Sequence, residues 1–445
     1  MKKFIKNIAL LFLVILFTGF SLQLAAQKTG GIKGFIHNQE TGEPVLFANV
    51  FLMGTTLGSV SNDDGYFIIT EVPIGVYTLR ATYVGFDSVV RMIEIKEGAI
   101  GNIHIDLAPR KDILGKFTLE GDRTTDLTET KTSVIKVTPK QIDRIPSIGG
   151  QSDIAQFLQV VPGIVSTGDQ GGQLYIRGGS PIQNKVLLDG MVIYNPFHSI
   201  GLFSVFDNEI IQTADIYTGG FNAEYGGRIS SVMDIRTRDG NKRTLAGNAN
   251  ISTFGAKVML EGPLRKSRDI DKSNTSFILS AKHSYLEEAS NLLYEYVSDN
   301  GLPFNYTDLY GKMSINSDNG SKVNFFGFNF NDRVSYEALS DYQWNSYGIG
   351  TNFIAIPASS PMLIKGNFAF SNYFTSVEDE SSTPKSSEIT GFNMGLHFTN
   401  VKGNNNNSYG IEILGFKTNF QITNIANRVI DQVENTTEMA FYYKY

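Results

Sequence analysis

The sequence of 445 residues contains no cysteine, and this absence removes several kinds of chemistry. Disulfide bonds, thiolate nucleophiles and cysteine-ligated zinc are excluded, because each of them requires a thiol. The fold must therefore be held together by packing, hydrogen bonding and strand pairing alone.

Histidine is also scarce, since only five occur, at positions 37, 104, 198, 283 and 397. These positions are scattered, and the sequence contains neither a His-Glu-x-x-His helix motif nor a Gly-x-Ser-x-Gly turn. We therefore expect no catalytic residues, no metal site and no cofactor, and we do not expect an enzyme.

The chain has no excess of basic residues, because 38 Lys and Arg stand against 44 Asp and Glu, for a formal net charge of -6. A protein that binds nucleic acid needs a basic face that neutralises phosphates. The charge balance therefore argues against nucleic acid as a partner.

Long apolar runs are lacking except near the N-terminus, where residues 8–17 follow Lys2, Lys3 and Lys6. This run is shorter than the ~20 residues that a membrane-spanning helix requires. We therefore interpret residues 1–26 as a signal peptide that is cleaved near Ala26. Since no cysteine follows, a lipid-anchored N-terminus is excluded, and we expect the mature protein to leave the cytoplasm.

Residues 27–110 contain short alternating segments, at 32–37, 48–53, 66–70 and 77–83. Turn-forming residues at 41–44 and 62–65 separate them, which predicts antiparallel strands in a small β-sandwich. A calcium loop at Asp63 and Asp64 is an alternative, but such a loop needs further ligands at fixed offsets, ending in a glutamate. We favour the turn.

This segment resembles the carboxypeptidase regulatory-like domain that precedes many Bacteroidetes outer-membrane receptors. The resemblance rests on residues 31–34, 41–44, 48–50, 64–67, 72–77 and 83–86. Despite its name, that domain has no peptidase centre, so the resemblance implies a non-catalytic accessory module. Residues 111–144 are polar and charged, with a threonine-rich tract at 124–132, and we interpret them as a linker.

The pattern changes at residues 145–240, where apolar residues from Ile154 to Val161 have helical spacing before Pro162. Ser152 is placed to cap this helix. Short strands are expected at 174–180, 186–190, 210–218 and 232–236, which together predict a compact mixed α+β unit.

The segments 174–181, 186–196, 217–221 and 225–236 resemble the plug of TonB-dependent receptors. The resemblance implies a domain that fills a β-barrel until TonB pulls on the preceding linker. It also implies a TonB box in that linker, an extended segment that adds as a strand to TonB. The best candidate is the segment Lys116, Phe117, Thr118, Leu119 and Glu120.

The charged residues of these motifs allow a ligand-binding interpretation or a structural one. Buried charges persist only when they are paired, so we interpret them as structural ion pairs. The residues concerned are Arg177, Asp189, Arg228, Asp234 and Arg236.

The glycines at 178, 179, 219, 220, 226 and 227 are interpreted as turn residues rather than a phosphate loop.

An exposed loop is expected after the strand at 186–190. We expect this loop to contact substrate through Tyr194, Asn195, Phe197 and His198.

From residue 241 onward, apolar and polar residues alternate with a period of two. Val258 and Leu260 are on one phase, and Lys257 and Glu261 are on the other. Residues 318–320 predict a tight hairpin turn. We expect about eight or nine strands of ~10 residues, whereas a plugged barrel takes about 22. Residues 241–445 are therefore expected to be the N-terminal part of a truncated barrel.

The fold expected is mainly β: an N-terminal β-sandwich, a mixed α+β plug and an incomplete antiparallel transmembrane β-barrel. The resemblance implies a TonB-dependent receptor of the cell outer membrane that imports an unidentified large or scarce nutrient. Its implied partners are TonB, outer-membrane lipid and the unknown substrate, and a surface lipoprotein partner is left open. The alternative is a secreted or surface β-protein for adhesion or glycan binding.

Overall fold

The computed structural model describes residues 29–110, 134–147, 151–166, 173–199, 201, 203–265, 273–293, 301–336, 340–358, 360–378, 384–403, 405–424, 426 and 428–445. The expected signal peptide (1–26) and the TonB-box candidate (116–120) lie outside these residues.

The N-terminal part, residues 29–110, is here called the sandwich. One sheet has the order β4-β1-β7, formed by β4 (Tyr66–Pro73), β1 (Thr29–Asn38) and β7 (Ile100–Leu107). The other has the order β3-β2-β5-β6, formed by β3 (Gly58–Val60), β2 (Asn49–Leu52), β5 (Gly75–Thr82) and β6 (Val89–Ile95). Buried side chains such as Ile36, Leu79 and Ile105 fill the space between the sheets. The predicted β-sandwich is confirmed.

One detail of the sandwich differs from the expectation of antiparallel strands. β1 pairs in parallel with β7 over eight register partners, from Gly31 with Ile100 to Asn38 with Leu107. Two strands that are remote in sequence can pair in parallel once an intervening segment crosses over. Period-two alternation shows which face of a strand is buried but does not indicate its direction relative to a neighbour.

The second part, residues 134–240, is here called the plug unit. Its five-stranded sheet has the order β12-β11-β14-β13-β8, formed by β12 (Met191–Val192), β11 (Asn184–Leu188), β14 (Ser231–Thr237), β13 (Ile211–Tyr217) and β8 (Val134–Val137). The remaining elements are α3 (Pro139–Ile142), α4 (Ile154–Gln159), β9 (Ile164–Ser166), β10 (Leu174–Ile176), η2 (Pro181–Gln183) and η3 (Asn208–Ile210).

Two expectations about this unit need correction. Residues 134–142 were expected in the linker, but they form β8 and α3, and β8 pairs with β13 along its whole length. The cap of α4 is Asp153 rather than Ser152, because the Asp153 carboxylate accepts the Ala155 N–H at 2.8 Å. Both residue types cap helices well, so the sequence alone does not decide between neighbours.

The third part is a ten-stranded sheet in which every strand pairs antiparallel with the next one along the chain. We call this sheet the wall. Its strands are β15 (Ala246–Ile251), β16 (Gly255–Arg265), β17 (Asn274–Ser284), β18 (Phe304–Asn316), β19 (Lys322–Tyr336), β20 (Ser340–Ala355), β21 (Met362–Glu378), β22 (Lys385–Lys402), β23 (Asn405–Thr423) and β24 (Val429–Lys444). The predicted turn at 318–320 joins β18 to β19, and Gly320 there has φ 82°. The ten strands slightly exceed the expected eight or nine.

The wall has one polar and one apolar face. Val258 and Leu260 are exposed, whereas Lys257 and Glu261 point toward the interior and are largely covered. This arrangement inverts that of a water-soluble sheet and matches a barrel whose outer face meets lipid. A short helix, α5 (Leu286–Leu293), follows β17. In the part of the chain that the structure describes, no helix is long and apolar enough to cross a membrane.

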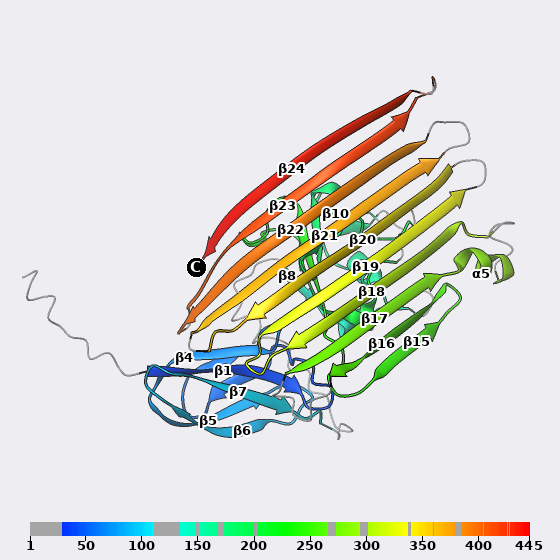
Figure 1. Cartoon of the computed structure of the whole chain (residues 1–445). Helices are drawn as coiled ribbons and strands as arrows, with labels where there is room; N and C mark the ends of the chain where they lie inside the picture. Colours follow the sequence, from blue (N-terminus) through cyan, green and yellow to red (C-terminus); the bar gives the residue numbers. More distant parts are fainter. Residues whose placement is uncertain are drawn as a thin grey trace, which may run out of the picture.

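Figure 1 shows how the three parts are arranged. The plug unit lies against one face of the wall, and the sandwich lies at one end of the wall strands. Contacts with the sandwich come from the β18–β19 turn, where Gly320 approaches Phe35, and from the segment after β20, where the Pro357 carbonyl accepts from Lys33. The wall therefore contacts both of the other parts.

The close β1–β7 pairing generates a prediction about Gly34. A Cβ atom at this position would lie 1.7 Å from the carbonyl oxygen of Ile103, so Gly34→Ala must force β1 and β7 apart. We expect a loss of about 3 kcal/mol in the unfolding free energy of the sandwich, the upper end of ordinary overpacking. Hydrogen exchange of β1 and β7 in the full chain measures it. The control is Gly101→Ala in β7, where the nearest atom is 3.9 Å away; equal exchange in both variants would contradict the pairing.

Candidate functional site

The plug unit meets the wall at a turn formed by Asp189 and Gly190, between β11 and β12. Both residues have positive φ, 51° and 86°. Glycine adopts this conformation freely and aspartate tolerates it better than most residues. The turn directs its two carbonyl oxygens toward the wall.

Three wall asparagines on adjacent strands donate hydrogen bonds to this turn. Asn352 on β20 donates to the Asp189 carbonyl at 3.2 Å, and Asn367 on β21 donates to the Gly190 carbonyl at 3.2 Å. Asn393 on β22 donates to the same Gly190 carbonyl. Asn352 and Asn367 are register partners, so the strand pairing itself places the amides side by side. The asparagine row recognises the backbone of the turn rather than a side chain.

The Asp189 side chain is buried within a polar network. Its carboxylate accepts from the Thr237 N–H at 3.0 Å and from the Tyr310 hydroxyl at 2.7 Å. Lys312 on β18 lies 3.6 Å away and is itself almost fully buried. A buried carboxylate costs several kcal/mol unless it is paired and hydrogen-bonded, and this one is both. Asp189 thus has the structural role that the sequence predicted.

His198 forms a second polar contact between plug unit and wall. Its Nε2 lies 2.8 Å from a carboxylate oxygen of Asp308 on β18, and its Nδ1 lies 3.0 Å from one of Asp332 on β19. The ring is fully buried and stacks on Tyr306 at 3.8 Å between ring centroids. Both ring nitrogens face carboxylates, an arrangement that suits the doubly protonated imidazolium.

The charge of His198 follows from these neighbours. Burial on its own would lower the pKa of His198, but Asp308 and Asp332 outweigh it, so the pKa is raised above the ordinary value. Lys282 on β17 also pairs with Asp308, at 3.1 Å between nitrogen and oxygen. The buried group therefore contains two cations and two anions, which satisfies the pairing that burial demands.

The expectation of an exposed loop at 194–198 is wrong for Phe197 and His198, which are 5% and 0% exposed. Tyr194 and Asn195 are half-buried, and the Tyr194 ring lies 6.5 Å from that of Tyr373 on the wall. The loop is polar because it faces charged wall residues, not because it faces water. Contact of these four residues with substrate stays a prediction.

A third contact lies near the start of β13, at Asp207. Its carboxylate accepts from Lys257 on β16 at 3.2 Å and from the Ser280 hydroxyl on β17 at 2.7 Å. Burial tends to raise the pKa of Asp207, but Lys257 and these hydrogen bonds hold the pKa below its usual value. The Asp207 carboxylate is therefore charged in the seated plug unit.

Three further charged motif residues of the plug unit, Asp234, Arg236 and Arg228, have partners that the structure shows. Arg236 pairs with Asp234 at 3.2 Å and with Asp63 of the sandwich at 2.7 Å, so the ion-pair interpretation is confirmed for these motif residues. Arg228 donates to the carbonyl of its neighbour Gly227 at 2.7 Å.

The glycines that the sequence predicted to form turns can now be compared with the backbone. Positive φ is found at 178, 219, 220 and 227. The structure thus assigns backbone roles to these four glycines.

Sequence reasoning missed the wall residues that complete the site. Asp308, Tyr310 and Lys312 occupy the inward phase of β18 and alternate with Leu309, Gly311 and Met313 on the outward phase. The alternation in the sequence indicates that these three residues share a face, but it does not indicate that they pair with the plug unit.

Removal of the His198 ring should weaken the seating of the plug unit. His198→Ala leaves Asp308 and Asp332 buried with fewer partners, and breaking such a pair costs about 3–5 kcal/mol. Hydrogen exchange of residues 184–206 in the full chain measures the free energy of local opening. The control is His283→Ala, an exposed wall histidine bonded to Thr307 at 2.9 Å, which should change it by less than about 0.5 kcal/mol. Similar losses in both variants would contradict the assigned role.

The seating should also depend on pH through His198. Because its folded pKa is raised above the ordinary 6.5, the protonated ring contributes fully below about pH 6.5, and the contribution is lost as pH rises through the raised pKa. The free-energy difference between wild type and His198→Gln should therefore be largest in acid and shrink in alkali. A difference that stays constant from about pH 5 to 9 would exclude a protonated His198.

Comparison with known proteins places this geometry in a family. Residues 32–119 match the family model of the CarboxypepD_reg-like domain, and residues 126–232 match that of the TonB-dependent Receptor Plug Domain. The chain is 25% identical over 260 residues to the TonB-dependent receptor SusC of Bacteroides thetaiotaomicron, covering 54% of this chain and 24% of the relative. It is 25% identical over 261 residues to the TonB-dependent receptor P3 of Formosa agariphila, covering 56% and 24%. The match thus spans about a quarter of the length of these curated relatives.

Two solved structures share the fold. The alcaligin outer membrane receptor FauA of Bordetella pertussis aligns with a TM-score of 0.53 at 12% identity, covering 71% of this chain and 52% of that one. FpvA of Pseudomonas aeruginosa, bound to a heterologous pyoverdine, aligns with a TM-score of 0.50 at 10% identity, covering 72% and 50%. The alternative of a secreted adhesion protein finds no support in these relatives. The two domain matches, their order before a receptor-type wall and the curated relatives support a TonB-dependent receptor of the Bacteroidetes type.

Proposed function

We propose that this chain forms part of a receptor that imports a scarce nutrient across the outer membrane, with TonB as the energy source and movement of the plug unit as the gate. The observation that carries the proposal is the seating of the plug unit on the polar face of the wall through buried ion pairs. Such pairs are costly to leave half-formed, so they favour one closed position.

The place where force would enter is the edge strand β8. This four-residue strand is the first described element after residues 111–133, which contain the candidate TonB box. It pairs only with β13 in the order of the sheet. TonB bound to an extended segment at Lys116–Glu120 would pull on β8 before any other strand of the plug unit. The position of the TonB box remains part of this proposal.

Substrate contact is proposed for Tyr194 rather than for the buried His198. Tyr194 lines a cavity of about 210 Å³ between plug unit and wall, together with Arg228 and Phe392. The exported, lipid-embedded location and the surface lipoprotein partner, both expected from the resemblance, belong to the same proposal.

The absence of cysteine makes a direct test possible. A Cβ atom at Gly226 in the plug unit would lie 3.8 Å from the Cβ of Ala440 on β24, which is the usual spacing in a disulfide. We expect the variant Gly226→Cys with Ala440→Cys to bind the plug unit covalently to the wall. Deletion of the gene first identifies the nutrients on which growth depends on this receptor. Cells whose only copy of the receptor is the double-cysteine variant should then fail to grow on those nutrients.

The controls are the two single-cysteine variants and the double variant treated with a reductant, all of which should grow like the wild type. Peptide mapping establishes that the disulfide has formed. Normal growth with the bridge intact would show that the plug unit need not move, and the proposed gate would be wrong.

A further inference from the structure

The sandwich is docked on the wall through an apolar contact. Phe35, Tyr66 and Ile68 of the sandwich form one buried cluster with three wall residues, Ile354, Ile356 and Leu363. Beside it, the almost fully buried Lys33 donates to the carbonyl oxygens of Pro357 and Ser360, at 2.5 and 3.0 Å. A buried apolar cluster beside hydrogen-bonded polar groups is typical of a formed interface rather than of a loose tether.

One turn of the sandwich joins all three parts. Asp64 pairs with two wall lysines, Lys365 at 2.7 Å and Lys322 at 3.7 Å. The preceding Asp63 pairs with Arg236 of the plug unit at 2.7 Å, and its carbonyl accepts from Gln212 at 2.9 Å. The turn 62–65 therefore contacts β14, the central strand of the plug sheet, and β13, which lies between β14 and β8.

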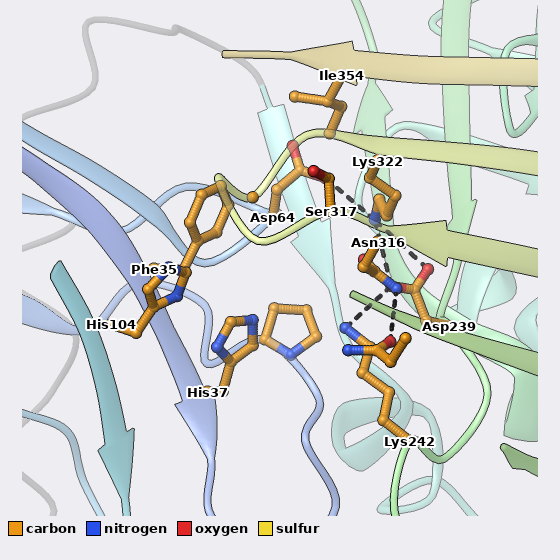
Figure 2. A pocket seen from close by; sticks show the side chains of 13 residues that line it. Phe35, His37, Asp64, His104, Asp239, Lys242, Asn316, Ser317, Lys322 and Ile354 are labelled. Carbon is orange, nitrogen blue, oxygen red and sulfur yellow. Dashed lines mark hydrogen bonds and ion pairs between the residues drawn. The ribbon is translucent and has the colours of Figure 1, made fainter. Parts of the chain in front are cut away.

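A second ionic contact supports the first. Glu43 of the sandwich accepts from Arg238 at 2.9 Å, and Arg238 also pairs with Glu261 of the wall at 2.5 Å. Figure 2 shows the junction between these contacts, where Lys322 and Lys242 converge on Asp239 and Asp64 lies above them. The cavity at this junction is about 40 Å³, room for only about three waters.

The charges at this junction are fixed in the docked state. Burial tends to raise the pKa of Asp64, but Lys365, Lys322 and Arg236 outweigh it, so the pKa lies below its usual value. Asp64 is therefore an anion that pairs with two wall lysines, while its neighbour Asp63 pairs with Arg236 of the plug unit. Displacement of the plug unit would separate Arg236 from Asp63 and would therefore break a contact of the same turn, 62–65.

We propose that the sandwich is a latch: while its turn 62–65 and its apolar face are docked, it holds the plug unit in the wall, and its release precedes movement of the plug unit. This inference rests on the proposed function for its consequence in transport, whereas docking itself can be measured independently. It gives the accessory module a mechanical role in gating.

The test reverses one charge of the docking turn in the full-length receptor. Asp64→Lys places a cation beside Lys322 and Lys365, and we expect hydrogen exchange of β4 and β14 to rise at least tenfold. The wall should remain folded, which resistance to heat unfolding in detergent monitors. The matched control is Asp87→Lys, because Asp87 belongs to an exposed ion pair with Arg110 at 3.2 Å away from the junction.

The latch is then tested in cells that lack TonB. The probe is vancomycin, and its leakage through the receptor is measured as a lower inhibitory concentration. We expect Asp64→Lys to lower the inhibitory vancomycin concentration at least fourfold. The charge swap Asp64→Lys with Lys365→Asp should restore both docking and resistance, which excludes simple misfolding. Adding the Gly226–Ala440 disulfide to Asp64→Lys should also restore resistance if the displaced plug unit is the path.

Three outcomes would overturn the latch. Unchanged hydrogen exchange in Asp64→Lys would show that the turn does not hold the sandwich. Faster exchange without leakage would show that the sandwich docks but does not retain the plug unit. Failure of the charge swap to restore docking would attribute the effect to misfolding. The proposed gate itself fails only if the disulfide leaves growth unchanged, so the two results are separable.

Discussion

Charged groups buried between the plug unit and the wall must be paired, because an isolated charge there costs several kcal/mol. This constraint determines how the two parts fit. His198 requires the carboxylates of Asp308 and Asp332 on neighbouring strands, and Asp189 requires Lys312 and the Tyr310 hydroxyl. All of these pairs form together only when the plug unit lies at one height and in one rotation against the strands.

The same pairing is compatible with the movement of the plug unit that we propose. A buried ion pair adds little net stability compared with well-packed apolar groups, but a misplaced one is strongly unfavourable. The interface therefore gives a well-defined closed state without an excessive barrier to opening. Apolar packing is also present, because Phe326, Phe328 and Trp344 of the wall belong to the core cluster of the plug unit. The polar contacts decide where the plug unit sits, and the apolar contacts decide how firmly.

The architecture could be predicted from local patterns, whereas the site could not. Period-two alternation and the turn at 318–320 predicted the wall, and turn chemistry predicted the sandwich. The parallel β1–β7 pair and the strand β8 were missed, because the local sequence of a strand carries no signal about a distant partner. His198 was expected to be exposed because its carboxylate partners lie 110 and 134 residues later in the chain. A polar loop that packs on a polar wall has the same sequence signature as a loop in water.

The asparagine row on β20, β21 and β22 has a consequence for how the wall is assembled. A slip of one residue between two strands would turn every side chain of the shifted strand to the opposite face. Asn367 would then lie on the outer, apolar face while Phe368, its exposed neighbour, would face the Asp189–Gly190 turn. Only the native alignment offers the turn its amides, so a slipped strand would lose its hydrogen bonds to the plug unit.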